Sequence, residues 1–215
     1  MTAFESFKNA CNAACHDRHA CANGFRAMLA AENVGQLMAV WRDNWDDLVE
    51  SKYADIINEK LPAFYPELKE DMNAAGIYVN ECPAVAPEFV MVIVTDFDYD
   101  VNIYDYAKCF VLGRAHVCAR DHAQVYSEKN DDCVIHLFGH SYGHASKGRV
   151  VAYDFSRLCT STDAALSGCV RCEAHGGDIL AYDYLKIEAY GNTKVFSRSD
   201  SNISLYGNAQ LVALN

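Results

Sequence analysis

The sequence predicts an α+β chain in which a small all-α N-terminal domain is followed by a β-solenoid. Apolar residues recur at helical spacing up to about Asn80, and the period changes to two after a loop at 83–87. From Tyr99 onward an eight-residue repeat overlies this alternation, which indicates stacked β units. We therefore expect a helical domain over 1–80, a linker and leading strand over 81–98, and a solenoid over 99–215.

The helical domain is predicted from an amphipathic stripe. Val34, Leu37, Met38 and Trp41 follow the i, i+3, i+4, i+7 spacing. The stripe continues through Trp45, Leu48, Val49, Ile56 and Ile57. We expect four or five short helices, with boundaries at Asn23-Gly24, at Asn33 as a cap, at Pro62 and Pro66, and at Gly76.

The solenoid is predicted from repeats of the form Ala-x-Val-x-small-x-turn-x. They run over 107–127 and return over 185–213. Because eight is even, every repeat turns the same side chains inward. A unit this short cannot bury its own apolar face, so we expect two repeats, or sixteen residues, in each stacked coil. A Greek-key sandwich with similar alternation is the alternative.

The middle of the solenoid, about 129–180, breaks this register. Alternation on odd positions is expected to continue through 133–137 and through Val151, Tyr153 and Phe155. The stretch 159–168 is predicted to be an inserted loop, after which Val170, Cys172 and Ala174 occupy even positions. Gly176-Gly177 is expected to restore the odd register at Ile179.

Composition excludes several classes of protein. With 215 residues, 51% of them hydrophobic, the chain can build a sizeable core and is not disordered. The net charge of −11 disfavours direct binding to a nucleic-acid backbone. No secretion signal or run of 18 apolar residues occurs, so we predict a cytoplasmic protein with no membrane partner. The ten cysteines are accordingly interpreted as reduced thiols.

Three segments resemble the Ala-x-Val-x-Ala-Tyr-Gly-x repeats of solenoid proteins from gut bacteria and their phages: ARDHAQVYS, AYDYLKIEAYGNTKVFS and ISLYGNAQLVA. The opening HACANGF, with Trp41 and Trp45, is similar to a short helical module found beside such repeats. The resemblance implies a cytoplasmic protein of a phage or mobile element and brings no catalytic residues. Small acidic proteins of that context include stoichiometric inhibitors of defence systems such as CRISPR-Cas, so the resemblance also implies an inhibitor.

Candidate metal sites rest on spacing. Cys11, Cys15 and His19 would share one helix face, which suits zinc, but two small thiols buried in a helix stripe explain the pattern as well. Cys169 and Cys172 form a CxxC motif, yet residues three apart on a strand point to opposite faces, which favours a core role for Cys172. We predict no cofactor.

Two further clusters are interpreted as structural. His136, His140 and His144 are interspersed with glycines, so we expect solvated loop histidines instead of one helix face. Asp96, Asp98 and Asp100 alternate along a strand but lack the glycine and glutamate of a calcium loop. We expect an acidic edge protected against strand pairing.

The outward face of the solenoid offers the clearest binding candidates. At sixteen residues per coil, Phe110 lies over Tyr126 and Tyr190 over Tyr206, giving aromatic ladders flanked by cations. Such ladders also simply stabilise neighbouring coils. The predicted partner-binding residues are Phe110, Tyr126, Tyr190, Phe196, Tyr206, Asp43, Asp46, Asp47, Asp96, Asp98 and Asp100.

The sequence thus predicts a non-catalytic protein-binding protein. Its most specific form, implied by the resemblance, inhibits a defence nuclease or its complex. The second hypothesis is a self-assembling rod that dimerises through a C-terminal edge ending in Leu211, Ala213 and Leu214. The third is a zinc-dependent enzyme or sensor that uses Cys11, Cys15 and His19. No GxSxG, HExxH or P-loop motif is present, so an enzyme is not the expectation.

Overall fold

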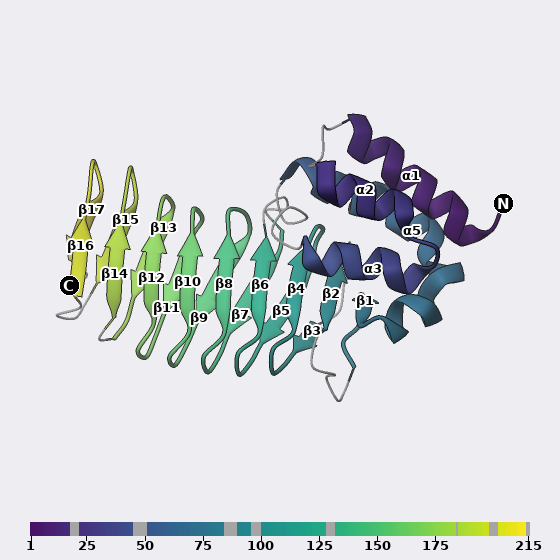
Figure 1. The fold of residues 1–215 in the computed structure, drawn as a ribbon. Coiled ribbons are helices and arrows are strands. Elements are labelled where there is room, and N and C mark those ends of the chain that lie inside the picture. The colour runs from purple at the N-terminus through teal and green to yellow at the C-terminus, as the bar shows by residue number, and fades with distance from the viewer. Residues whose placement is uncertain are drawn as a thin grey trace. The chain divides into compact units, whose positions relative to one another are not determined.

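The computed structural model has the predicted fold class, with helices followed by a parallel β-solenoid (Figure 1). The chain divides into two compact units, Met1–Val79 and Asn80–Asn215. The structure describes residues 1–17, 22–44, 51–83, 90–95, 100–127, 132–183, 185–197 and 202–213, and only the backbone of 51–59.

The first unit contains four described helices and one short strand: α1 (Ala3–Asp17), α2 (Ala22–Ala30), α3 (Val34–Asp43), α5 (Ser51–Ala74) and β1 (Ile77–Val79). The predicted stripe of α3 is confirmed, because Leu37 and Trp41 are buried. Asn33 caps this helix as expected, since its side-chain oxygen accepts a hydrogen bond from the Gln36 N–H at 2.9 Å. The Phe7 ring of α1 meets that of Trp41 edge-on at 5.8 Å.

The helix boundaries predicted at Asn23-Gly24, Pro62 and Pro66 are wrong. Asn23-Gly24 lies inside α2, and α5 continues through both Pro62 and Pro66. Each proline removes a backbone donor, but Leu61 and Leu68 are buried beside them, and this packing offsets the loss. The stop at Gly76 is confirmed by its φ of 80° just after α5. The predicted positions Trp45, Leu48 and Val49, and the side chains of Ile56 and Ile57, lie outside the described residues.

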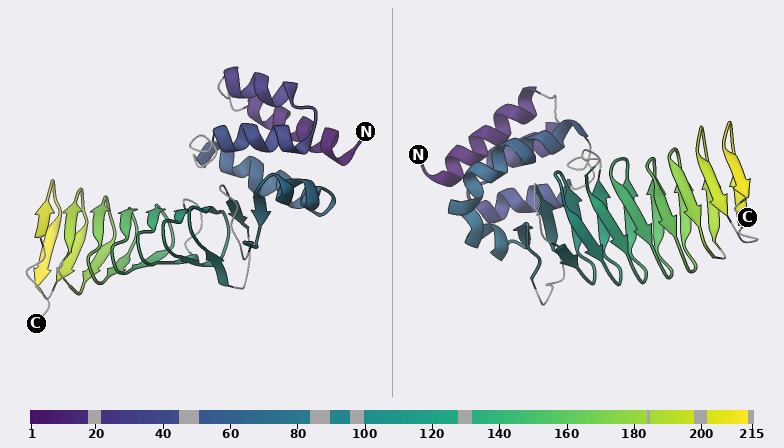
Figure 2. Two further views of the ribbon diagram at one scale, coloured as in Figure 1. Left: turned by 60° about the horizontal axis from the view of Figure 1, so that its bottom comes forward. Right: turned by 180° about the vertical axis from the view of Figure 1, so that it is seen from behind.

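The second unit is built from two parallel sheets, which the two views of Figure 2 show as rows of stacked strands. Sheet A contains β2 (Met91–Val94), β4 (Lys108–Val111), β6 (Gln124–Ser127), β8 (Tyr142–Ala145), β10 (Arg157–Thr160), β12 (Arg171–Ala174), β14 (Lys186–Ala189) and β16 (Asn202–Leu205). Sheet B contains β3 (Asp100–Ile103), β5 (His116–Ala119), β7 (Val134–Leu137), β9 (Arg149–Ala152), β11 (Ala164–Leu166), β13 (Asp178–Ala181), β15 (Lys194–Ser197) and β17 (Gln210–Ala213).

The chain alternates between the sheets, so each coil contributes one strand to each. The strand pairs within both sheets are parallel, which excludes the Greek-key alternative. In the regular coils the register partners are sixteen residues apart, as for Val101 with Val117 and Val195 with Leu211. Val117, Val125 and Val195 are fully buried between the sheets, so the predicted inward positions form the core there.

The middle coils correct the prediction for that region. Ile135 pairs with Val150 and Leu158 with Cys172, offsets of fifteen and fourteen residues. An odd offset moves the inward side chains to even positions, and Val150 and Leu158 are accordingly buried. The expected inward role of Val151, Tyr153 and Phe155 is therefore wrong, and Phe155 is 59% exposed.

The predicted loop over 159–168 is also wrong. This stretch contains the end of β10 and all of β11, and Leu166 is fully buried. The even register of Cys172 and its reversal before Ile179 are confirmed, because both residues are buried. The inward positions change from odd to even numbers at the corner that contains Gly148 and back to odd numbers at the corner that contains Gly177. These two glycines have φ of 90° and 78°. A shortened corner can therefore change the parity while the strands keep their inward face.

Candidate functional site

A groove of about 850 Å³ lies along the outer face of sheet A. One wall is formed by the corners that lead from sheet B into β4, β6, β8, β10 and β12. The floor is formed by outward side chains of β6, β8, β10 and β12. The lining residues are Tyr106, His122, Gln124, Tyr126, His140, Tyr142, Phe155, Arg157, Cys169 and Arg171. Aromatic rings and cations thus share the groove, and none of these described lining residues is a carboxylate.

The corner wall is a ladder of stacked rings. His122 stacks on Tyr106 at 5.2 Å between ring centroids, with 19° between the planes. His140 continues the ladder at 5.4 Å from His122, and Phe155 follows at 5.4 Å from His140. Such near-parallel contacts stabilise adjacent coils and hold the rings rigid. At the equivalent place in the following corner the chain has Cys169, so the ring ladder stops at Phe155.

The floor carries cations in successive strands. Arg157 pairs in register with Arg171, and Arg171 with Lys186, so three basic residues occupy one column. Lys186 forms an ion pair with Glu188 at 3.1 Å, whereas no hydrogen bond or ion pair joins the side chain of either arginine to another described residue. Like charges on directly opposed strand positions repel each other. This column therefore favours an anionic group placed between the two arginines.

Tyrosines complete the floor. The Tyr126 hydroxyl donates a hydrogen bond to Gln124 Oε1 at 3.1 Å. Burial is the main cause that raises the pKa of Tyr142 to about 12, and the neighbouring Cys159 adds to it. Tyr142 therefore stays a neutral phenol near pH 7 and can donate a hydrogen bond into the groove.

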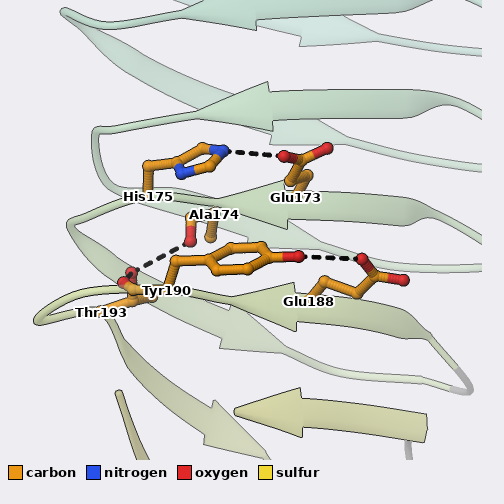
Figure 3. A network of polar contacts seen from close by, with 6 residues as sticks. All are labelled: Glu173, Ala174, His175, Glu188, Tyr190 and Thr193. Atoms are coloured by element: carbon orange, nitrogen blue, oxygen red, sulfur yellow. Dashed lines mark hydrogen bonds and ion pairs between the residues drawn. The ribbon is translucent and has the colours of Figure 1, made fainter. Parts of the chain in front are cut away.

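A second ladder lies at the corners that leave sheet A near the C-terminal coils. Figure 3 shows His175 and Tyr190 in adjacent coils, with ring centroids 5.0 Å apart. Tyr190 stacks in turn on Tyr206 at 4.7 Å, which confirms the predicted pairing. The Tyr190 hydroxyl donates to Glu188 Oε2 at 3.2 Å, and His175 contacts Glu173 at 2.9 Å. This ladder is flanked by carboxylates, unlike the groove.

The last coil exposes positions that are buried in earlier coils. Inward positions such as Ile187, Ala189 and Val195 are fully buried. In β16 and β17 the corresponding Leu205 and Leu211 are 40% and 52% exposed. No described strand pairs with the outer edges of β16 and β17. Apolar surface therefore gathers on this coil.

The predicted aromatic candidates fall into two groups. Tyr126 and Tyr190 are partly exposed on the outer face, and Tyr206 is 48% exposed. Phe196 is also partly exposed, but it lies on sheet B between Leu180 and Val212. The structure therefore distributes these residues over two sides of the solenoid, and only Tyr126 lines the groove.

The expectation that Phe110 is accessible is wrong. It pairs in register with Tyr126, as predicted, and also with Ile93, but only 1% of its surface is exposed. Ile93 is fully buried in the same column, and all four residues of β2 are buried. Both faces of the first strands of sheet A are covered, as their nearly continuous apolar sequence implies.

Of the predicted acidic residues, the structure describes Asp43 and Asp100. Asp43 is exposed at the end of α3 beside Arg42, with 3.5 Å between Oδ1 and Nε. Asp100 begins β3, and its carboxylate contacts Nδ1 of His116 in the next coil. Asp46, Asp47, Asp96 and Asp98 lie outside the described residues.

Of the nine cysteines that the structure describes, five are buried. Cys11 and Cys15 are buried in α1, and burial raises the pKa of the Cys11 thiol far above its usual range, with a smaller effect from Cys15. His19 lies outside the described residues. Cys172 is buried with a pKa raised to about 12, chiefly by burial, while its CxxC partner Cys169 is exposed. Within the described ranges, no group of three or more ligating side chains could hold a metal ion.

Two of the three histidines that were expected in loops lie in strands. His136 lies in β7 and His144 in β8, so the expectation of loop positions is wrong for both. His140 does lie in a corner, where it is held in the ring ladder. Partial burial lowers the pKa of His136, and the nearby His116 lowers it further.

Sequence reasoning missed the arginines and the corner rings of the groove. Phe155 and Arg157 are odd-numbered and fall inward in the odd register predicted through Val151 and Tyr153. Arg171 falls outward in the even register of Val170 and Cys172, but no motif singles it out. The alternation of Val150 with Ala152 and of Leu158 with Thr160 is the signal that could have shown the change of parity.

The chain has no match among the family models, the curated proteins or the solved structures. Within the described chain, none of the helices combines the length and apolar character needed to cross a membrane.

Proposed function

We propose that this chain is a non-catalytic protein-binding protein whose partner docks on the last coils of the solenoid. The observation that carries the proposal is the apolar surface at 180–211. Five large hydrophobic residues there are more than a third exposed: Leu180, Tyr182, Leu205, Tyr206 and Leu211. Leu205, Tyr206 and Leu211 all belong to the last coil, and exposed apolar side chains that cluster in this way are typical of protein interaction sites.

The ladder beside this surface suits an interface. Tyr206 rests on Tyr190, and the hydrogen bond from Tyr190 to Glu188 holds that ring in place. A pre-oriented tyrosine loses little conformational freedom when a partner binds, which is why tyrosine is frequent among interface anchors. The neighbouring carboxylates of Glu173 and Glu188 favour a partner with basic residues at the rim of its contact.

The more specific proposal is that the partner is a bacterial defence protein such as a nuclease complex. It is supported by the resemblance of the repeats to phage and gut-bacterial solenoids and by the net charge of −11. An acidic protein can compete with a nucleic acid for a basic surface through its charge. The groove has the opposite sign, so charge mimicry would use other faces of the chain.

Site-directed photo-crosslinking tests the docking surface. A photoreactive phenylalanine analogue at position 206 should crosslink to one heterologous protein in a host lysate. The same analogue at Tyr104, which is also exposed but lies in the first coils, is the matched control. Identical products from both positions, or none from position 206, would contradict the proposal.

A self-assembling rod is the second candidate, and the exposure of Leu205 and Leu211 favours it specifically. An unpaired parallel edge can add a strand from a second copy. Light scattering should then show a dimer that Leu211→Asp dissociates. A strict monomer at high concentration would exclude this candidate and leave the heterologous partner.

The zinc hypothesis for Cys11, Cys15 and His19 remains a prediction. Cys11 and Cys15 are four residues apart in α1, as the hypothesis requires, but burial favours their protonated forms. Elemental analysis of protein purified without chelator tests it, and a zinc content well below one ion per chain would reject it.

A further inference from the structure

We propose that the groove on sheet A binds a small ligand that joins a planar ring to a phosphoryl group, which is the chemistry of a nucleotide. The ring would stack on Phe155 beside Cys169, and the phosphoryl group would lie between Arg157 and Arg171. This site goes beyond the proposed protein-binding function, and it uses other coils than the surface at 180–211.

The ring position follows from the interruption of the corner ladder. Tyr106, His122, His140 and Phe155 form a continuous stack, and each inner ring is covered on both faces. The next corner has Cys169 where another ring would continue the stack. Phe155 is 59% exposed, and the small Cys169 side chain leaves room beside it. A planar ring from a ligand can occupy this place and extend the stack.

The anion position follows from the two arginines. Arg157 and Arg171 are register partners on neighbouring strands, which lie about 4.8 Å apart. Both are exposed, and neither guanidinium group forms an ion pair or hydrogen bond with a described residue. A phosphoryl group presents several oxygens and can accept hydrogen bonds from two guanidinium groups at once. Its charge would also relieve the repulsion between the two arginines.

The ring and anion positions belong to one ligand because they are adjacent along the chain and line the same groove. Phe155 precedes Arg157 by two residues, and Cys169 precedes Arg171 by two residues. The groove volume of about 850 Å³ is in the range of small-molecule sites. The neutral phenol of Tyr142 lies in register with Arg157 and can donate a further hydrogen bond to the ligand.

The surrounding charges favour a single phosphoryl group over a nucleic-acid strand. The chain has 29 acidic residues, yet no acidic residue is among the described residues that line the groove. Immediately beyond Arg171, however, the outer face carries Glu173, and Glu188 follows in the next strand of that column. A polyanion that extended along the strands would meet these carboxylates and be repelled.

Calorimetric titration of the full chain tests the proposal with defined probes. The probes are the four ribonucleoside 5′-monophosphates, the matching nucleosides and inorganic phosphate. At least one monophosphate should bind ten-fold or more tightly than both its nucleoside and inorganic phosphate, because only the monophosphate occupies both positions. Equal affinity for the monophosphate and either fragment, or no binding by any monophosphate, would overturn the proposal.

Variants assign the binding to this groove. Arg157→Gln and Arg171→Gln should each weaken monophosphate binding at least ten-fold. Arg149→Gln removes the same charge from an exposed position on sheet B and should leave the affinity unchanged. Phe155→Leu should weaken monophosphate binding without changing phosphate binding. If Arg149→Gln has the same effect as the groove variants, the attraction is only general electrostatics and the proposal fails.

Thiol protection provides a readout independent of heat release. Cys169 is exposed and borders the proposed ring position, whereas Cys172, three residues later, is buried. A saturating monophosphate should slow alkylation of Cys169 several-fold, as followed by peptide mass spectrometry. An unchanged rate at saturation would place the ligand elsewhere. Loss of nucleotide binding would leave the crosslinking result at position 206 untouched, so the two proposals fail separately.

Discussion

The regular coils and the middle coils of the solenoid each add one strand to both sheets, but they differ in the number of residues per coil. In the regular coils, 100–127 and 178–213, strand partners such as Lys194 and Gln210 are sixteen residues apart and the inward positions keep one parity. In the middle coils, partners such as Arg157 and Arg171 are only fourteen apart. The strands of both regions have four residues, except β11 with three, so the corners absorb most of the difference. The inward face is thus a property of the sheet, and sequence parity follows it only where coil length is even.

The shorter middle coils also determine which side chains reach the groove. The column formed by Arg157, Arg171 and Lys186 crosses the change of parity, because the first two positions are odd and the third is even. A strict sixteen-residue repeat would assign these residues to opposite faces. The shortened corners bring them onto one face instead.

Adjacent valines give the sharpest test of the parity change. Val150 is fully buried between the sheets, while Val151 is partly exposed on the outside. Val150→Asp should lower the free energy of unfolding by more than about 4 kcal/mol, because it buries an unpaired charge. Val151→Asp should cost about 1 kcal/mol or less. Urea denaturation measures both, and a larger loss for Val151→Asp would reverse the assignment of faces.

The glycine corners offer the next largest effect. Gly177 has φ of 78°, and a Cβ there would lie 2.4 Å from the carbonyl carbon of Thr162. Gly177→Ala should therefore cost about 3 kcal/mol, from backbone strain and the forced shift of a neighbouring corner. Gly191, in a regular coil, has φ of 63° but its nearest contact would be at 3.7 Å, so Gly191→Ala should cost about 1 kcal/mol. Equal losses in urea denaturation would mean that the middle corner is not especially constrained.

The ring ladders should stabilise both regions alike. Tyr190 stacks on Tyr206 at 4.7 Å in a regular coil, and Phe138 stacks on Tyr153 at 4.9 Å in the middle. Tyr190→Leu and Tyr153→Leu should each lower the free energy of unfolding by about 1 kcal/mol. Tyr190→Phe keeps the stack and should have the smaller effect. A loss confined to one region would show that the corner geometry, and not the stacking, determines the contribution.

A corner carboxylate should give the smallest effect, visible as a pH dependence. Hydrogen bonds from the Ser167 hydroxyl at 2.6 Å and the Gly168 N–H at 2.9 Å lower the pKa of Asp183. A carboxyl group with a lower pKa in the folded state stabilises the fold above its unfolded pKa, and this stability is lost as the pH falls through the folded value. Asp183→Asn should therefore reduce the loss of stability between about pH 5 and pH 3. Asp178→Asn, at an exposed carboxylate, is the control, and an equal reduction there would contradict the assignment.

Much of the solenoid could be predicted because its period is local. The repeats around Val117, Val125 and Val195 alternate with an even period, and the stack of Tyr190 on Tyr206 follows from that period alone. The helical stripe through Leu37 and Trp41 is equally local. The candidate groove could not be predicted, because its residues come from five successive corners and four strands, and the corners between these strands differ in length.

The sequence by itself determined the succession of helices and stacked β units, since periods of 3.6 and two residues select those elements directly. Only the tertiary structure decided which side chains the middle coils turn outward and which outward positions are covered. Phe110 and Arg157 illustrate both cases: Phe110 lies at an outward position and is buried, and Arg157 lies at a position of inward parity and is exposed. Burial depends on what packs against a strand and on the length of each corner, and neither is encoded in a local repeat.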